Sequence, residues 1–376
     1  MQAVRIGPGP DVTGQAMYRR SISSHHFYDK LLIWHSDIPG QSTQKHAIVK
    51  PLLKKPNMDQ FDMKSYRPVS KLTFISKFME RFAVSRFHEH ARAHRLFPVH
   101  QSAYRSCHST ETAIVNILGK IFQAVDSDKV CALVLLDLTA DFDTVDHSIL
   151  LTVLKERFGV QKGVFDWFNS YLEGRTQCVS APTGRSEPVE LTCGVPQGSV
   201  LGPVKVIAYT EDLHTATNKF PSLHHCFADD SHLLARVAIN DVNLARRCLE
   251  SCVTDIHDWC ARRRLQLNPE KSELIWFGSR TNLDRLQAMH TTNHLDQADI
   301  KPIDCVRDLA VLLDSSLSMR EHITKVTSTY FFHLRRLHVL SRILDIDDLR
   351  SCTDTCRLLQ LCARRSVRHR ISAAAA

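Results

Sequence analysis

Residues 223–237 read LHHCFADDSHLLARV, and this stretch decides the fold. Two mainly apolar segments, 223–227 and 233–237, flank the four residues Ala228-Asp229-Asp230-Ser231. The pattern predicts a β-hairpin that carries both carboxylates at its tip. Because adjacent carboxylates repel each other, a tight turn that holds two of them favours a bound cation. Taken alone, the pair also fits a solvated turn.

A third carboxylate lies far upstream, at the end of a run of seven apolar residues. Residues 130–136 read VCALVLL, which is too short for a membrane helix and predicts a fully buried strand. Asp137 follows that strand directly. We therefore expect Asp137, Asp229 and Asp230 to cluster at one end of a small, mostly antiparallel sheet, with helices on its opposite face. The alternative for Asp137 is a helix N-cap.

Such a cluster has a specific chemical use. Three carboxylates form an oxygen site for hard divalent cations. Two such ions about 3.5–4 Å apart stabilise both the attacking and the leaving oxygen of a phosphoryl transfer.

Between these acids, residues 194–203 read GVPQGSVLGP. Gly, Pro and Gly within five residues predict a fixed bend, and glycine lets the backbone approach a ligand closely. Ser199 is predicted to cap a helix that continues to about Leu213. The alternative is an ordinary Pro/Gly turn.

Further segments accompany these motifs in a fixed order. They are YRPVS (66–70), QSAYR (101–105), HSTETA (108–113), LDLT (136–139), FDTVDH (142–147), FADD (227–230), LQLNPEKSEL (265–274) and VRDL (306–309). With them, roughly residues 46–344 resemble the reverse transcriptases of non-LTR (LINE-type) retrotransposons, above all the jockey and chicken-repeat branches.

The resemblance implies an α+β, right-hand polymerase fold. The reverse transcriptase domain is expected at 45–313, with fingers at 45–130 and a ferredoxin-like palm at 131–313. A truncated helical thumb is expected at 314–376, and a poorly structured leader at 1–44.

The same resemblance implies an RNA-directed DNA polymerase that extends a DNA primer on an RNA template with dNTPs. Asp137 and Asp229 are expected to ligate two Mg²⁺ ions, with Asp230 close by. These ions would activate the primer 3′-hydroxyl and neutralise the pyrophosphate that leaves.

Roles for further residues also follow from the resemblance. Phe142 is expected under the deoxyribose, where it excludes a 2′-hydroxyl, and Gln197 and Gly198 are expected to line the nucleotide and template. Arg67 would grip the triphosphate, and Lys271 would act as general acid to pyrophosphate. The alternatives are a core phenylalanine, a surface ion pair for Arg67 and a solvated charge for Lys271.

Apolar spacing predicts the main helices and one further strand. Helices are expected at 75–96, 149–158, 164–172 and 245–265, and a strand at 274–277. Asp143 and Asp146 are expected to cap the helix that follows them. In the region expected to form the thumb, apolar residues at 331, 334, 337 and 340 keep a helical period.

Charge is distributed unevenly along the 376 residues, whose net charge is +8. Residues 45–105 carry +9, residues 106–256 carry −7, and residues 257–376 carry +5. A polyanion between the basic flanks, with divalent cations at the acidic centre, would satisfy all three segments. Lysines and arginines that merely coat solvated helices are the alternative.

The twelve cysteines are scattered and lack zinc-ligand spacing, which favours reduced thiols. No secretory signal or membrane-spanning run is visible. We therefore expect an intracellular protein, in the nucleus or the cytoplasm, with no membrane partner.

Several residues depart from the family pattern. Asp141 stands beside Phe142 in place of a small residue, Lys205 in place of an apolar one, Ala310 in place of glycine, and Phe227 in place of tyrosine. After about residue 349 the resemblance ends, which predicts a truncated thumb or an altered reading frame.

These departures keep a second hypothesis open, a decayed or adopted copy that binds nucleic acid without copying it. A third hypothesis is an RNA-dependent RNA polymerase, against which Phe142 argues.

Overall fold

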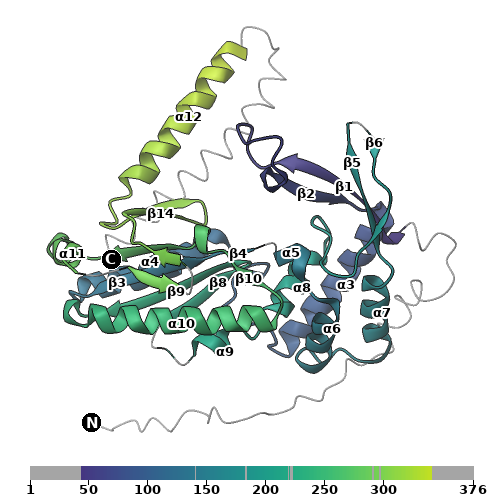
Figure 1. The fold of residues 1–376 in the computed structure, drawn as a ribbon, viewed down its shortest axis with the longest axis horizontal. Coiled ribbons are helices and arrows are strands. Elements are labelled where there is room, and N and C mark those ends of the chain that lie inside the picture. Colours follow the sequence, from purple (N-terminus) through teal and green to yellow (C-terminus); the bar gives the residue numbers. More distant parts are fainter. Residues whose placement is uncertain are drawn as a thin grey trace, which may run out of the picture. The chain divides into compact units, whose positions relative to one another are not determined.

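A computed structural model describes residues 44–340, apart from 140, 183, 219, 221–222, 290–291 and 296–297. These residues form two units, each built from two separate stretches of chain (Figure 1). The first unit takes residues 44–97 and 145–209, and the second takes 98–144 and 210–340.

A mixed sheet organises the first unit. Its strand order is β2-β1-β5-β6, with β7 also paired to β5, and β1 runs antiparallel to β2 but parallel to β5. The strands are β1 (His46–Leu53), β2 (Tyr66–Lys71), β5 (Thr176–Ala181), β6 (Gly184–Arg185) and β7 (Val189–Glu190). The helices are α3 (Phe74–Ala93), α6 (His147–Glu156), α7 (Lys162–Leu172) and α8 (Gly202–Tyr209), with a 3-10 turn at Met63–Ser65.

Polar side chains directly before two of these helices cap their N-termini. The Thr73 hydroxyl accepts the Ser76 N–H at the start of α3, and the Asp146 carboxylate accepts the Ile149 N–H at the start of α6. The capping expected of Asp146 is thus confirmed. The helix expected from Ser199 to about Leu213 is wrong in length. Ser199 Oγ does accept the Gly202 N–H, but α8 ends at Tyr209.

A four-stranded antiparallel sheet organises the second unit, in the order β11-β3-β9-β8. Its strands are β3 (Val130–Leu136), β8 (Leu223–Phe227), β9 (Asp230–Val237) and β11 (Glu273–Phe277). The buried strand, the hairpin and the strand at 274–277 that the sequence predicted are therefore confirmed.

Smaller elements complete the second unit. The helices are α4 (Thr110–Asp126), α5 (Asp141–Thr144), α9 (Leu213–Thr217), α10 (Val242–Arg262), α11 (Arg280–Gln287) and α12 (Arg320–Leu340), with 3-10 turns at Ile239–Asp241 and Pro269–Lys271. The short strands pair as β4 (Leu138–Thr139) with β10 (Gln266–Leu267), β12 (Asn293–Leu295) with β13 (Ala298–Ile300), and β14 (Cys305–Asp308) with β15 (Val311–Asp314).

The core of the second unit packs α4 against the sheet. Ile117 and Ile121 of α4 are buried with Leu133 of β3 and Phe277 of β11 in one apolar cluster. A reciprocal capping box between Ser109 and Thr112 starts α4, so the sequence around them sets where this helix begins. Leu249, Val253, Ile256 and Trp259 of α10 are all buried, and α10 packs against β9 (Figure 1).

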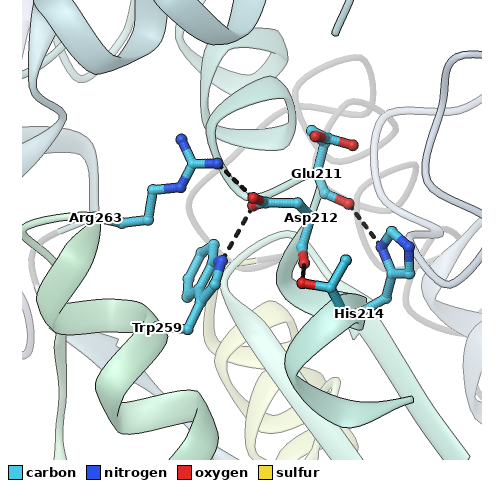
Figure 2. Close-up of polar contacts among 6 residues, drawn as sticks. Glu211, Asp212, His214, Trp259 and Arg263 are labelled. Carbon is cyan, nitrogen blue, oxygen red and sulfur yellow. Dashed lines mark hydrogen bonds and ion pairs between the residues drawn. The ribbon is translucent and has the colours of Figure 1, made fainter. Parts of the chain in front are cut away.

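One carboxylate joins α9 to α10. Asp212 accepts hydrogen bonds from the Trp259 indole N–H at 3.1 Å and from the Arg263 guanidinium at 2.6 Å (Figure 2). Burial of an aromatic N–H requires such a partner. Asp212, which lies between α8 and α9, therefore holds the start of α9 against the C-terminal end of α10.

The chain after β15 forms α12, as the helical period predicted. The Asp314 carboxylate accepts the backbone N–H groups of Ser318 and Met319 just before this helix. Phe331 and Leu334 of α12 are 52% and 38% exposed. Apart from Gln44, the expected leader lies outside the described residues, as does the chain beyond Leu340.

Among the described helices, none is long and apolar enough to cross a membrane. Every cysteine in the described part of the chain is a free thiol.

Candidate active site

Strand register brings the three acids together. Leu136, the last residue of β3, pairs with Ser231 of β9, so Asp137, the next residue in the chain, is brought beside Asp230. Phe227 pairs with Asp230 across a two-residue loop, which places Asp229 in the turn itself. One carboxylate oxygen from each of Asp137, Asp229 and Asp230 lies within 4.8 Å of the others. The predicted clustering at one end of an antiparallel sheet is confirmed.

The backbone around Asp137 excludes the helix-cap alternative. The Asp137 carbonyl accepts the Asn268 N–H at 2.9 Å, and β4 begins at the next residue. Asp137 therefore lies between two strands and does not start a helix.

The electrostatics of the cluster fit a cation. Burial raises the pKa of Asp229, and the neighbouring charge of Asp137 raises it further. Burial, followed by the charge of Asp229, raises the pKa of Asp230 to about 6. A divalent cation would relieve this repulsion, and three carboxylates are the hard oxygen donors that such cations prefer. The residues present therefore fit a divalent metal.

A lysine already faces the cluster. Lys271 Nζ donates to Asp137 Oδ2 at 2.7 Å, with the Lys271 side chain 63% exposed. The 3-10 turn Pro269–Lys271 sets the position of the lysine. The N–H of Ser272, the next residue, closes this turn by donating to the Asn268 carbonyl at 3.1 Å. Lys271 thus contacts one acid of the cluster, while its role in proton transfer stays a prediction.

Other predicted site residues gather in the first unit. Arg67 is exposed on β2, and Gln197 and Gly198 lie in the loop before α8. This loop is bonded to β2, since the Ser70 N–H donates to the Gln197 carbonyl at 2.8 Å. Gly198 has φ +109°, and a Cβ there would meet the Ser70 carbonyl at 3.0 Å, so only glycine fits.

Phe142 lies in α5, within the second unit, and its side chain lies outside what the structure describes. The same holds for its neighbour Asp141. The roles predicted for Phe142, Arg67, Gln197 and Gly198 stay predictions.

Glu80 is a residue that the sequence analysis missed. It is fully buried on α3, and its carboxylate accepts the Val200 N–H of the 194–203 loop and the Tyr171 hydroxyl, the latter at 2.7 Å. Glu80 therefore holds the loop that carries Gln197 and Gly198. The signal available in the sequence was an acid on the apolar face of the helix, four residues from Ser76, with which it also bonds.

Comparison with known proteins identifies the family. Residues 53–303 match the family described as reverse transcriptase (RNA-dependent DNA polymerase). The chain therefore belongs to the reverse transcriptase family. Its curated relatives include RNA-directed DNA polymerases from the Drosophila transposon BS and the mobile element jockey.

Two relatives give the scale of the similarity. The probable RNA-directed DNA polymerase from transposon BS of Drosophila melanogaster is 30% identical over 77% of this chain and 32% of its own length. The RNA-directed DNA polymerase from mobile element jockey of Drosophila funebris is 27% identical over 77% of this chain and 31% of its own length. The chain thus spans about a third of the length of these relatives.

Solved structures whose backbone is similar to that of this chain include telomerases. The apo telomerase from Candida tropicalis matches with a TM-score of 0.48 and 12% identity, over 68% of this chain and 50% of that one. The same telomerase in complex with a fragment of telomeric RNA gives a TM-score of 0.49 at 12% identity, over 92% of this chain and 58% of that one.

Proposed function

We propose that this chain is an RNA-directed DNA polymerase that adds dNTPs to a primer 3′-hydroxyl on an RNA template. The observation that carries the proposal is the cluster of three carboxylates at the end of the β3–β9 pair. Family membership supports the reaction class, and RNA-directed DNA polymerase is the activity for which the named relatives are described.

In this proposal, Asp137 and Asp229 would together ligate the same two Mg²⁺ ions, and Asp230 would supply a further carboxylate close by. Bound magnesium would activate the 3′-hydroxyl and neutralise the departing pyrophosphate. Lys271, at 2.7 Å from Asp137, lies within reach of the same acids and would donate a proton to pyrophosphate.

Further predicted residues would bind the incoming nucleotide. Arg67 offers a planar guanidinium to triphosphate oxygens. Gln197 and Gly198 present a loop whose backbone is fixed by Ser70 and Glu80. Phe142 would exclude a 2′-hydroxyl, so dNTPs are the expected substrates.

The test is primer extension on a primed RNA template with the purified chain. Asp229→Asn should abolish extension, because a neutral amide replaces a charged metal ligand. Its affinity for primer–template should change less than twofold, because phosphate contacts supply most of that affinity. Wild-type chain should use dNTPs in preference to rNTPs.

Asp258→Asn is the matched control. It removes the same charge in the same unit, from an exposed position on α10 whose side chain is 62% exposed. Equal extension by wild type and Asp229→Asn would defeat the proposed catalytic site, whereas preference for rNTPs would favour an RNA polymerase.

A second candidate function, nucleic-acid binding without copying, is favoured by two departures from the family pattern. Ala310 has a left-handed φ of +72°, and Lys205 is an amine buried to 1% exposure. The positive φ at Ala310 and the buried amine of Lys205 each destabilise the fold, and mutations that accumulate in a copy without selection would produce such features. Absence of extension in wild type, with salt-sensitive binding retained, would establish this candidate.

A further inference from the structure

The turn that carries two of the three acids contains a strained residue. Ala228, the first residue of the two-residue loop between β8 and β9, has φ +58°. For a residue with a Cβ, this left-handed conformation is strained. The conformation of Ala228 fixes the direction in which the chain enters Asp229, so something must hold it.

The side chain of Gln101 contacts both backbone polar groups of Ala228. Gln101 Oε1 accepts the Ala228 N–H at 2.9 Å, and Gln101 Nε2 donates to the Ala228 carbonyl at 3.1 Å. Gln101 is 4% exposed, so water competes little with these bonds. Its carboxamide therefore acts on Ala228 as a neighbouring strand would, with one acceptor and one donor.

Gln101 is itself held in place by backbone bonds. The Cys226 N–H donates to the His100 carbonyl at 2.8 Å, and the Ser102 N–H donates to the Cys226 carbonyl at 2.9 Å. The segment around Gln101 thus runs parallel beside the end of β8. The Ala103 N–H also donates to Gln101 Oε1 at 2.9 Å, which fixes the orientation of the amide.

We propose that Gln101 is a positioning residue for the three-aspartate cluster, holding Ala228 in the left-handed conformation that directs Asp229 and Asp230 towards Asp137. This inference rests on the proposed function of the cluster. It separates two tasks, since the aspartates supply the ligand oxygens and Gln101 supplies the shape of the turn. Loss of a hydrogen bond that orients a metal ligand directly typically lowers metal affinity 10–100-fold, and Gln101 orients the turn that carries two of the acids.

The test measures Mn²⁺ binding by the intact chain, from the loss of the free-ion electron paramagnetic resonance signal. Gln101→Met keeps the length of the side chain and removes both hydrogen bonds, so Mn²⁺ affinity should fall at least tenfold. Gln123→Met, at an exposed position of α4, is the matched control and should bind as wild type does.

A second substitution distinguishes a local from a general effect. Glycine adopts positive φ without a Cβ penalty. Ala228→Gly should therefore restore most of the Mn²⁺ affinity to Gln101→Met, while leaving an otherwise wild-type chain unchanged. If the double variant binds as poorly as Gln101→Met, the residue acts on the fold at large and the inference is overturned.

Asp229→Asn separates this inference from the proposed function. If Asp229→Asn loses Mn²⁺ binding and Gln101→Met does not, only the role of Gln101 fails. If wild type and Asp229→Asn bind Mn²⁺ equally, the proposed metal site itself fails. Should Gln101→Met not fold, Ala228→Val takes its place. It keeps Gln101 but disfavours positive φ further, and unchanged Mn²⁺ affinity in that variant would refute the inference.

Discussion

At the scale of single residues, two basic side chains and one acid are buried close together in the first unit. Lys205 and Arg175 are each 1% exposed, and Glu80 is fully buried beside them. Lys205 Nζ lies 3.8 Å from the centre of the Tyr171 ring, and within the described part of the chain it has no hydrogen-bond partner. Burial, followed by the charge of Arg175, lowers the pKa of Lys205 well below its usual value.

Replacement of this lysine should stabilise the protein. Lys205→Leu leaves Glu80 and Arg175 as a balanced pair and removes an amine that lacks a hydrogen-bond partner, so the free energy of unfolding should rise by about 1 to 3 kcal/mol. Urea denaturation followed by tryptophan fluorescence measures it. Lys155→Leu, at an exposed position of α6, should change stability little. A clear loss of stability in Lys205→Leu would show that the amine is stabilising where it lies.

The same variant predicts a pH dependence. Because the folded-state pKa of Lys205 lies below its unfolded value, the unfolded chain binds the proton more strongly. Wild-type stability therefore rises as the pH approaches the unfolded pKa of the lysine, and the advantage of Lys205→Leu should shrink over the same alkaline range. A gap that widens over this range would contradict the assignment.

At the scale of elements, the hairpin β14–β15 carries a strained turn of its own. Leu309 and Ala310 join its two strands with φ of +43° and +72°, where Asp308 pairs with Val311. Turns of this kind favour glycine or asparagine. Asp308 also bonds to His232 of β9 at 2.7 Å, so the hairpin is attached to the sheet that bears the acids.

Ala310→Gly should therefore raise the free energy of unfolding by about 1 kcal/mol, because glycine adopts this φ freely. The measurement is again urea denaturation of the intact chain. Ala238→Gly is the control. Ala238 is exposed with φ −66°, so glycine there should only add flexibility to the unfolded chain and lower stability. Equal effects of the two substitutions would rule out strain at Ala310.

The elements also show what local sequence can predict. The run at 130–136 and the hairpin around Asp229 follow from apolar patterning, because burial on a sheet has a local signature. The end of α8 at Tyr209 does not, because the turn after it is stabilised by hydrogen bonds that Asp212 accepts from Trp259 on α10 and from Arg263 just after it.

The same limit applies to the site. Clustering of the three acids was predictable from strands that end at them. The hydrogen bonds of Gln101 with Ala228 and of Glu80 with Val200 join residues more than a hundred positions apart, so no local pattern reveals them.

At the scale of the whole molecule, the uneven charge predicts how primer–template binding responds to salt. If the basic flanks neutralise about six phosphates, affinity should fall roughly 10³-fold between 50 and 200 mM salt. Fluorescence anisotropy of a labelled primer–template measures this fall. An affinity that does not change with salt concentration would contradict an interface built on phosphate contacts.

Matched lysine variants locate that interface. Lys50→Gln with Lys55→Gln removes two exposed charges from the basic 45–105 segment and should reduce the salt slope by about 0.9 for each phosphate that is no longer neutralised. Lys155→Gln with Lys162→Gln removes two exposed charges from α6 and α7 and should leave the slope unchanged. Equal slopes for the two pairs would place the interface elsewhere.

The interleaving of the two units has a consequence for synthesis on the ribosome. Each unit begins before the other is complete, since the chain leaves the second unit at Thr144 and returns to it at Thr210. Strand β3 therefore emerges long before its partners β9 and β11. Its apolar side chains must wait for them in the nascent chain, so the acid cluster cannot form before β9 has been synthesised.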